Sequence, residues 1–244
     1  MKQACCTIPP IKAEYSPVGS YEVFGGFKTY KTGPADAISA IFIVYDIFGF
    51  CPQILQGADL LAQLTNSQVF IPDLLKGEVA DFSWVPPDTE EKMKSFNAFI
   101  QGPASIPSAV SAVPTIIRDI TERIDGKITK WGALGFCWGY KIVAGQSGAG
   151  TPFVAAAGAH PSFISPEDAT TITVPFCILP SKDEDHRACK EFESRLKVDK
   201  HIETFMDMPH GWMAARGDLD DVHCKVEFER GYNVVGTFLN MYLS

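Results

Sequence analysis

Short apolar runs alternate along the chain with longer segments whose apolar residues recur at helical spacing. Residues 40–46 (AIFIVYD) form a continuous apolar run, which is typical of a strand covered on both faces of a sheet. Residues 53–66 repeat apolar side chains at the spacing of one helix face. Further strands are expected at 68–73, 130–136, 152–160, 173–180 and 201–207, and further helices at 184–197 and 221–243. This alternation predicts an α/β protein with a doubly wound, mostly parallel sheet flanked by helices on both faces.

The length of 244 residues fits one α/β domain that spans 1–244. Residues 1–25 are expected to form an N-terminal extension. The segment 77–90 is broken by Gly and Pro, so it is expected to be a surface loop, which either covers a pocket or is an idle insertion.

Charge and hydropathy restrict the partners. The formal net charge of −8 argues against nucleic acid and against an anionic membrane surface, because both are bound through excess Lys and Arg. The first residues have no apolar signal-peptide core, and no apolar stretch is long enough to cross a bilayer. A cytoplasmic location is therefore expected. The oligomeric state is open between a monomer and a weak homodimer.

The seven cysteines form neither a disulfide framework nor a metal site by their spacing. The count is odd, and neither a C-x₂-C pair nor an H-E-x-x-H motif occurs, so no metal and no cofactor are expected. In a reducing compartment a thiol stays free and is available as a nucleophile.

One cysteine stands out because it lies between two glycines at the end of a predicted strand. GFCWG (135–139) matches the nucleophile elbow G-x-S-x-G with sulfur in place of oxygen. Catalytic groups of such sheets gather at the carboxyl ends of the strands, which is where Cys137 falls. A free thiol has a pKa of about 8.5, so a nucleophilic Cys137 needs a histidine and a carboxylate as partners.

Two later strand ends offer these partners in the order nucleophile, acid, histidine that elbow hydrolases follow. PSKDED follows the strand 173–180 and supplies Asp183; MPHGW follows the strand 201–207 and supplies His210. Asp185 competes for the role of the acid. Asp183 is favoured because it is nearer the strand end and because Asp185 could cap the next helix.

Further residues are expected at the site, and for two of them, Asp46 and His160, two interpretations are open. One oxyanion donor would be the amide of Trp138, and the other would come from the loop after the strand 40–46. Asp46, which ends that strand, is either a carboxylate facing the thiol or a turn former. His160 either lines the site or anchors its loop through backbone hydrogen bonds. A set of aromatic residues suggests an apolar pocket, although such residues more often belong to the core: Phe48, Trp84, Trp138, Phe163 and Trp212.

The segments YDIFGF, GFCWG, GAHPS, SKDED and HGW occur in an order and at a spacing that resemble the dienelactone hydrolase family. The resemblance extends from about Gly26 to the C-terminal helix. The opening ACCTIPP…SYEVFGGFKTYKTGP is similar to the fungal branch of that family. The resemblance implies the α/β-hydrolase fold, a Cys-Asp-His triad and a small-molecule ester or lactone as the substrate.

Carried over to this chain, the resemblance makes Cys137 the nucleophile, Asp183 the triad acid and His210 the triad base. It assigns the oxyanion-hole amides to Ile47 and Trp138. Ester or lactone hydrolysis through an acyl-thioenzyme is the function that these roles imply. The alternative is a retired hydrolase that binds a small molecule or a partner without turnover.

The resemblance also implies a set of residues at the substrate. Asp46 occupies the position where the bacterial archetype has a glutamate paired with the resting thiol, and it is one methylene shorter. Arg216 lies near the place of an arginine that binds the substrate's carboxylate. With these two, the residues expected to bind substrate are Asp46, Phe48, His160, Trp212 and Arg216.

Overall fold

The computed structural model describes residues 10–124 and 127–244. Residues 1–9 of the expected N-terminal extension, including Cys5 and Cys6, lie outside the described residues. The described part contains an eight-stranded sheet with the strand order β1-β2-β4-β3-β5-β6-β7-β8. The strands are β1 (Ser20–Phe24), β2 (Phe27–Thr32), β3 (Ser39–Val44), β4 (Gln68–Pro72), β5 (Lys130–Phe136), β6 (Phe153–Ala159), β7 (Phe176–Leu179) and β8 (Lys200–Ile202).

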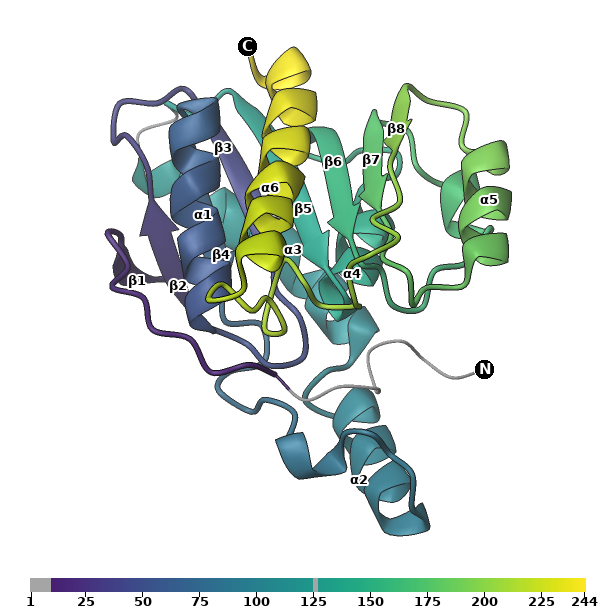
Figure 1. The fold of residues 1–244 in the computed structure, drawn as a ribbon. Helices are drawn as coiled ribbons and strands as arrows, with labels where there is room; N and C mark the ends of the chain where they lie inside the picture. The colour runs from purple at the N-terminus through teal and green to yellow at the C-terminus, as the bar shows by residue number, and fades with distance from the viewer. Residues whose placement is uncertain (1–9, 125–126) are drawn as a thin grey trace.

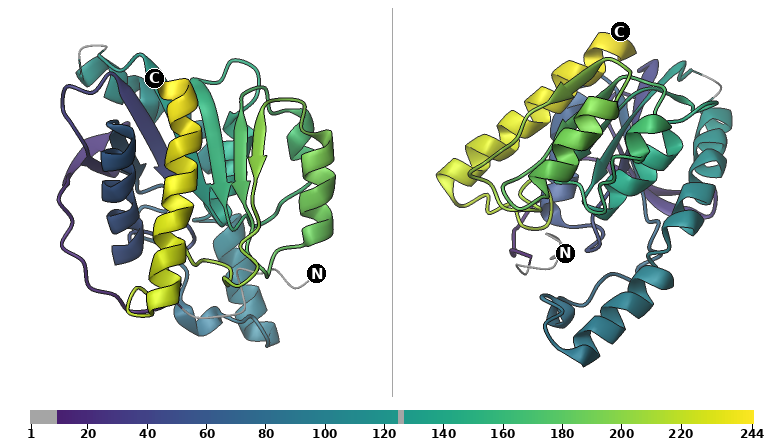
Figure 2. Two further views of the ribbon diagram at one scale, coloured as in Figure 1. Left: turned by 45° about the horizontal axis from the view of Figure 1, so that its top comes forward. Right: turned by 90° about the vertical axis from the view of Figure 1, so that its right-hand side faces the viewer.

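Helices cover both faces of this sheet (Figures 1 and 2). Helices α1 and α6 lie side by side on one face, and α3 and α4 lie on the other. Helix α2 projects from the body of the molecule. The helices are α1 (Pro52–Thr65), α2 (Glu90–Gln101), α3 (Ile106–Arg123), α4 (Trp138–Gln146), α5 (His186–Arg195) and α6 (Val222–Leu243), with 3₁₀ turns at Phe82–Trp84 and Asp168–Thr170. The predicted doubly wound, mostly parallel α/β sheet is confirmed.

The pairing of the strands divides the sheet into two parts. Strands β4, β3, β5, β6, β7 and β8 run parallel, whereas β1 and β2 form an antiparallel hairpin that joins the sheet through β4. All six residues of β3 are buried, as its unbroken apolar run predicted. The expected strand 201–207 is a strand only at its start, because β8 ends at Ile202.

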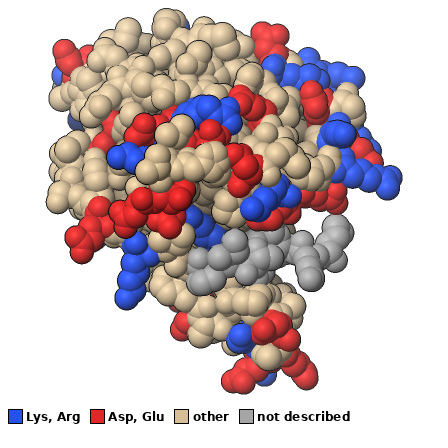
Figure 3. Space-filling model, in the orientation of Figure 1, with Lys and Arg blue, Asp and Glu red and all other residues tan. Residues whose placement is uncertain are grey.

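The described surface carries charges of both signs. Acidic and basic side chains are interspersed on the face shown in Figure 3. Within residues 10–124 and 127–244, none of the helices combines the length and the hydropathy that a membrane span requires.

The turn after β5 depends on two glycines that let backbones approach closely. A Cβ on Gly139 would lie 2.2 Å from the carbonyl oxygen of Val44 in the neighbouring strand β3. A Cβ on Gly135 would lie 2.3 Å from the carbonyl oxygen of Gly139. Helix α4 therefore begins pressed against the ends of β3 and β5, and the turn residue Cys137 is held between them.

We expect Gly139→Ala to lower the free energy of unfolding by at least about 2 kcal/mol, because the added methyl group overlaps backbone atoms that cannot move independently. Chemical denaturation measures this loss. Gly145→Ala in the same helix is the matched control, since its Cβ would meet only a side-chain atom of Val110 at 3.4 Å. That variant is expected to keep or gain stability, by up to about 1 kcal/mol. Equal stability of the two variants would contradict the tight packing of the turn.

Candidate active site

Cys137 sits in a strained turn between β5 and α4. Its φ of 54° and ψ of −113° place a non-glycine residue in a region of backbone conformation that side chains rarely adopt. Its N–H donates to the carbonyl oxygen of Ala159 at 3.1 Å, which fixes the turn to the end of β6. The thiol is almost completely buried, with a residue exposure of 3%.

Ser162 is a neighbour of the thiol that the sequence patterns did not single out. Its Oγ lies 3.2 Å from Cys137 Sγ, and its N–H donates to the carbonyl oxygen of Cys137 at 3.1 Å. The only signal in the sequence was its membership of the segment GAHPS (158–162). Ser162 therefore contacts both the backbone and the sulfur of the turn residue Cys137.

The imidazole of His210 is buried and paired with Glu184. Nδ1 of His210 lies 2.6 Å from Oε1 of Glu184, and both side chains are 1% exposed. The Glu184 carboxylate also accepts hydrogen bonds from the backbone N–H and the hydroxyl of Ser181. Burial disfavours a charged ring, yet the negative charge of Cys137 and the hydrogen bond and charge of Glu184 raise the pKa of His210 to about 9. These surroundings therefore favour a protonated His210 ring.

The two aspartates weighed from the sequence lie on either side of Glu184 and do other things. Asp183 Oδ2 accepts the backbone N–H of His210 at 2.8 Å, so it orients the histidine's main chain. Asp185 caps α5 by accepting the N–H groups of Arg187 and Ala188, as its alternative interpretation predicted. Successive side chains of this tight turn point in different directions, and the strand-end rule does not specify which carboxylate faces the ring.

Asp46 connects the loop after β3 to the loop after His210. Its Oδ1 accepts the N–H of Phe48 at 2.8 Å, and its Oδ2 accepts the N–H of Ala215 at 3.2 Å. Burial raises the pKa of the Asp46 carboxyl, although these two N–H groups and the charges of Arg216 and His210 act in the opposite direction. Asp46 therefore acts as a turn former, and its charge interacts with those of Arg216 and His210. That its carboxylate faces the thiol stays a prediction.

Arg216 is part of the wall of this region. It is 3% exposed, and its Nη1 donates a hydrogen bond to the carbonyl oxygen of His210 at 3.2 Å. Its guanidinium lies 5.8 Å from the ring centroid of Phe48. Arg216 therefore supports the backbone of His210 and flanks Phe48.

Of His160 and Trp212, only His160 has a ring contact with His210 in this structure. The His160 ring lies edge-on to that of His210, with 5.0 Å between the centroids, and is fully buried. Burial and the positive charges of His210 and Arg216 lower the pKa of His160 well below its usual range, so the ring stays neutral. Trp212 stacks on Phe205 at 4.3 Å inside the core, which makes it a packing residue in this structure.

Ile47 and Trp138 follow adjacent strands and lie on either side of the sheet end where Cys137 turns. Val44 and Gly135 are register partners in β3 and β5, which brings the two following loops together. Trp138 is the first residue of α4, so its amide has no acceptor inside the helix. Its indole Nε1 donates to the carbonyl oxygen of Ala104 at 2.9 Å, which anchors the turn to the loop before α3.

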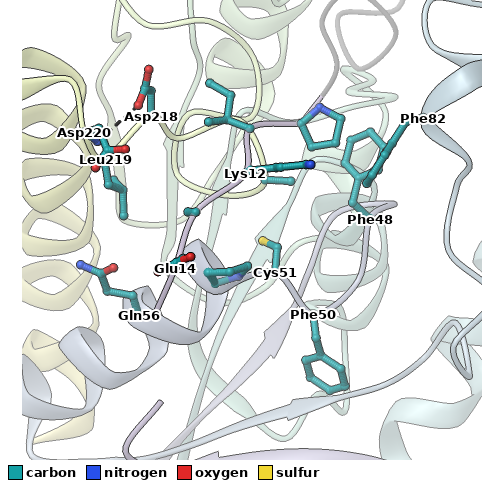
Figure 4. A pocket seen from close by; sticks show the side chains of 15 residues that line it. Lys12, Glu14, Phe48, Phe50, Cys51, Gln56, Phe82, Asp218, Leu219 and Asp220 are labelled. Atoms are coloured by element: carbon teal, nitrogen blue, oxygen red, sulfur yellow. Dashed lines mark hydrogen bonds between the residues drawn. The ribbon is translucent and has the colours of Figure 1, made fainter. Parts of the chain in front are cut away.

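A pocket of about 740 Å³ lies beside this region (Figure 4). Phe48 and Ala215, whose N–H groups donate to Asp46, contribute to the wall of the pocket. Phe82 of the segment 77–90 contributes to it as well. Figure 4 shows Lys12 extending across the pocket above Cys51 toward the rings of Phe48 and Phe82. The 77–90 segment thus contributes to a pocket wall, and the described part of the N-terminal segment forms another side of it. The described residues that line it are Pro10, Ile11, Lys12, Ala13, Glu14, Phe48, Phe50, Cys51, Pro52, Gln56, Phe82, Ala215, Asp218, Leu219 and Asp220.

The other described cysteines are free thiols in different surroundings. Burial raises the pKa of Cys51 and of Cys177, and neighbouring carboxylates (Asp46 and Glu203) raise it further. These thiols are therefore held in the neutral, unreactive form. Among the described residues, no group of three or more His, Cys, Asp or Glu side chains is placed to hold a metal ion.

Comparison with known sequences decides the family. The sequence model of the dienelactone hydrolase family matches residues 27–243. The chain belongs to the dienelactone hydrolase family. The resemblance read from the five short motifs is confirmed, and it spans β2 to the end of α6.

Individual relatives agree with this assignment. An AIM2 family protein of Schizosaccharomyces pombe is 36% identical over 245 residues, which cover 94% of this chain and 96% of the relative. A protein named hydrolase pyvD from Aspergillus violaceofuscus is 29% identical and covers 92% of this chain and 91% of its own length.

Solved structures share the α/β-hydrolase fold. The dienelactone hydrolase from Anabaena variabilis superimposes with a TM-score of 0.66 over 94% of this chain and 99% of its own, at 13% identity. Carboxyl esterase 2 from Tuber melanosporum gives a TM-score of 0.64 over 93% of this chain and 88% of its own, at 11% identity. The predicted α/β-hydrolase fold is confirmed.

We expect Cys137→Ala to lower the pKa of His210 from about 9 to between about 6 and 8, because the variant removes the negative partner while burial remains. A titration of the histidine ring protons by NMR measures this, with the surface residue His223 as the internal reference. The raised pKa also has a consequence for folding. Stabilisation by the charged ring is complete below the unfolded value of 6.5 and is lost as the pH rises through about 9. An unchanged His210 titration in the variant would contradict the ion pair.

Proposed function

We propose that the protein hydrolyses a small ester or lactone with Cys137 as the nucleophile. The observation that carries the proposal is the arrangement at the elbow: a cysteine in a strained strand-to-helix turn, interacting with a buried histidine whose other nitrogen lies 2.6 Å from a buried carboxylate. Nucleophile, base and orienting acid in this relation define a triad by role. The family assignment and the esterases that share the fold support the same class of reaction.

The first half of the reaction acylates the enzyme. The Cys137 thiolate attacks the substrate carbonyl carbon, and the amides of Ile47 and Trp138 stabilise the oxyanion that forms. Collapse of this intermediate breaks the carbon–oxygen bond of the ester. The leaving alkoxide takes the proton from the imidazolium of His210, which leaves a thioester on Cys137 and a neutral ring.

The second half releases the acid. His210 removes a proton from a water molecule as that water attacks the thioester carbonyl. The carbon–sulfur bond then breaks, the electron pair returns to sulfur, and the thiolate–imidazolium pair is restored. Throughout, the carboxylate at Nδ1 keeps the proton of the ring on that side and stabilises the positive charge.

We assign the role of the triad acid to Glu184 in place of Asp183. The support is direct contact: Glu184 meets the ring nitrogen, whereas Asp183 holds the backbone N–H of the same histidine.

The pocket beside Phe48 supports a substrate with an apolar portion. Phe48 and Phe82 form an aromatic wall, with 5.4 Å between the ring centroids, next to the loop that carries the Ile47 amide. Arg216 is buried and bonded to the carbonyl oxygen of His210, so its position favours support of the site over recognition of a substrate carboxylate. Aryl and alkyl esters are accordingly the first substrates to test.

We expect the pure protein to hydrolyse p-nitrophenyl acetate, and Cys137→Ala to remove this activity. Glu184→Gln should lower kcat by about 10² to 10⁴-fold, because the neutral amide no longer holds the ring or its charge. Asp183→Asn is the matched control: its amide oxygen still accepts the backbone N–H, so we expect a loss within about tenfold.

Three results would contradict the proposal. Full activity in Cys137→Ala would exclude the thiol as the nucleophile. A larger loss in Asp183→Asn than in Glu184→Gln would return the role of the acid to Asp183. Absence of turnover on any small ester or lactone, with a folded protein, would favour a binding protein.

A further inference from the structure

We propose that Ser162 donates its hydroxyl hydrogen to the sulfur of Cys137, and that this bond sets the position and the ionisation of the nucleophile. The inference rests on the proposed role of Cys137. It adds a fourth side chain to the three of the triad, contributed by the loop after β6.

Ser162 contacts Cys137 at two points, through its hydroxyl and through its backbone N–H. Its hydroxyl lies 3.2 Å from Sγ, within hydrogen-bonding distance for sulfur, and its amide binds the carbonyl oxygen of the same cysteine. The Cys137 N–H in turn donates to Ala159. Three hydrogen bonds thus join the turn to residues 159–162, and Ser162 is itself buried, with 5% exposure.

The direction of the hydroxyl bond follows from the charge on sulfur. A thiolate has no hydrogen to donate, so a serine beside it must be the donor. The proposed reaction uses Cys137 as a thiolate, and the negative charge of Cys137 raises the pKa of the buried His210 ring. Ser162 is therefore a hydrogen-bond donor to this sulfur from the loop after β6, and it acts together with the positive charge of His210.

The Ser162 hydrogen bond matters most in the step in which the thioester breaks. In that step the electron pair of the carbon–sulfur bond moves to sulfur while His210 is taking up a proton from water. The Ser162 hydroxyl stabilises this emerging negative charge and transfers no proton. The same bond is weak in the thioester, whose sulfur is a poor acceptor, so it favours the thiolate at the start and at the end of each cycle.

The test compares Ser162→Ala with Ser162→Thr, which keeps the hydroxyl. The fraction of thiolate is followed from its ultraviolet absorbance as a function of pH, after subtraction of the same protein with Cys137→Ala. We expect the apparent pKa of Cys137 to rise by about one unit or more in Ser162→Ala and to return toward the wild-type value in Ser162→Thr. Ser165→Ala removes a hydroxyl from the same loop that binds Glu167 instead of sulfur, and it should leave the titration unchanged.

The rate of alkylation by iodoacetamide gives an independent readout. Ser162→Ala should react about tenfold more slowly than wild type at pH values below the thiol pKa of both proteins. Above the pKa it should react as fast or faster, because a more basic thiolate is the better nucleophile. This crossing of the two pH profiles is specific to a changed ionisation.

Two outcomes would overturn the inference. One is a Cys137 titration in Ser162→Ala that matches the wild type. The other is an alkylation rate lowered by the same factor at every pH, which would mean that Ser162 only packs against the turn. Neither measurement requires an ester, so a shifted titration together with absent ester hydrolysis would retain the Ser162 bond and refute the proposed reaction.

Discussion

The strained backbone of Cys137 is the constraint on which the rest of the site depends. A non-glycine residue with φ of 54° costs on the order of 1 to 3 kcal/mol, and it persists only where its surroundings impose it. Here the imposing contacts are the close approach of Gly139 to β3 and the hydrogen bonds that tie the turn to the end of β6. The strained residue lies directly between the end of β5 and the first residue of α4. The packing of the core and the position of Cys137 are therefore one arrangement.

Charge balance explains why so many ionisable groups are buried at this edge of the sheet. An isolated charge in the interior is costly, but the groups here occur as pairs with opposite sign. Cys137 and Glu184 face His210, and the Asp46 carboxylate lies in the field of Arg216. His160 completes the group as a neutral ring, because the surrounding positive charge and burial oppose its protonation. The pairing stabilises the charged form of the His210 ring between Cys137 and Glu184.

The sequence was informative where periodicity and motif coincide, and less so where direction matters. Apolar runs located the central strands because these strands are buried on both faces. The β1–β2 hairpin was not predicted, since its residues alternate between exposed and buried positions without a strong pattern. Helix α3 was missed as well, because Pro114 interrupts a helical stripe that packing nevertheless stabilises. The elbow and His210 followed from strand ends, whereas the contacts of Glu184 and Ser162 depend on where side chains point within tight turns.

The central claim is that an acyl group passes through the sulfur of Cys137. The most direct measurement is mass spectrometry of the protein quenched in acid during turnover of an aryl ester, followed by peptide mapping. We predict one added acyl group on the peptide that contains Cys137, and its accumulation when deacylation is slowed. Turnover that proceeds with the acyl group on another residue, or with an unmodified Cys137 at every time point, would contradict the account.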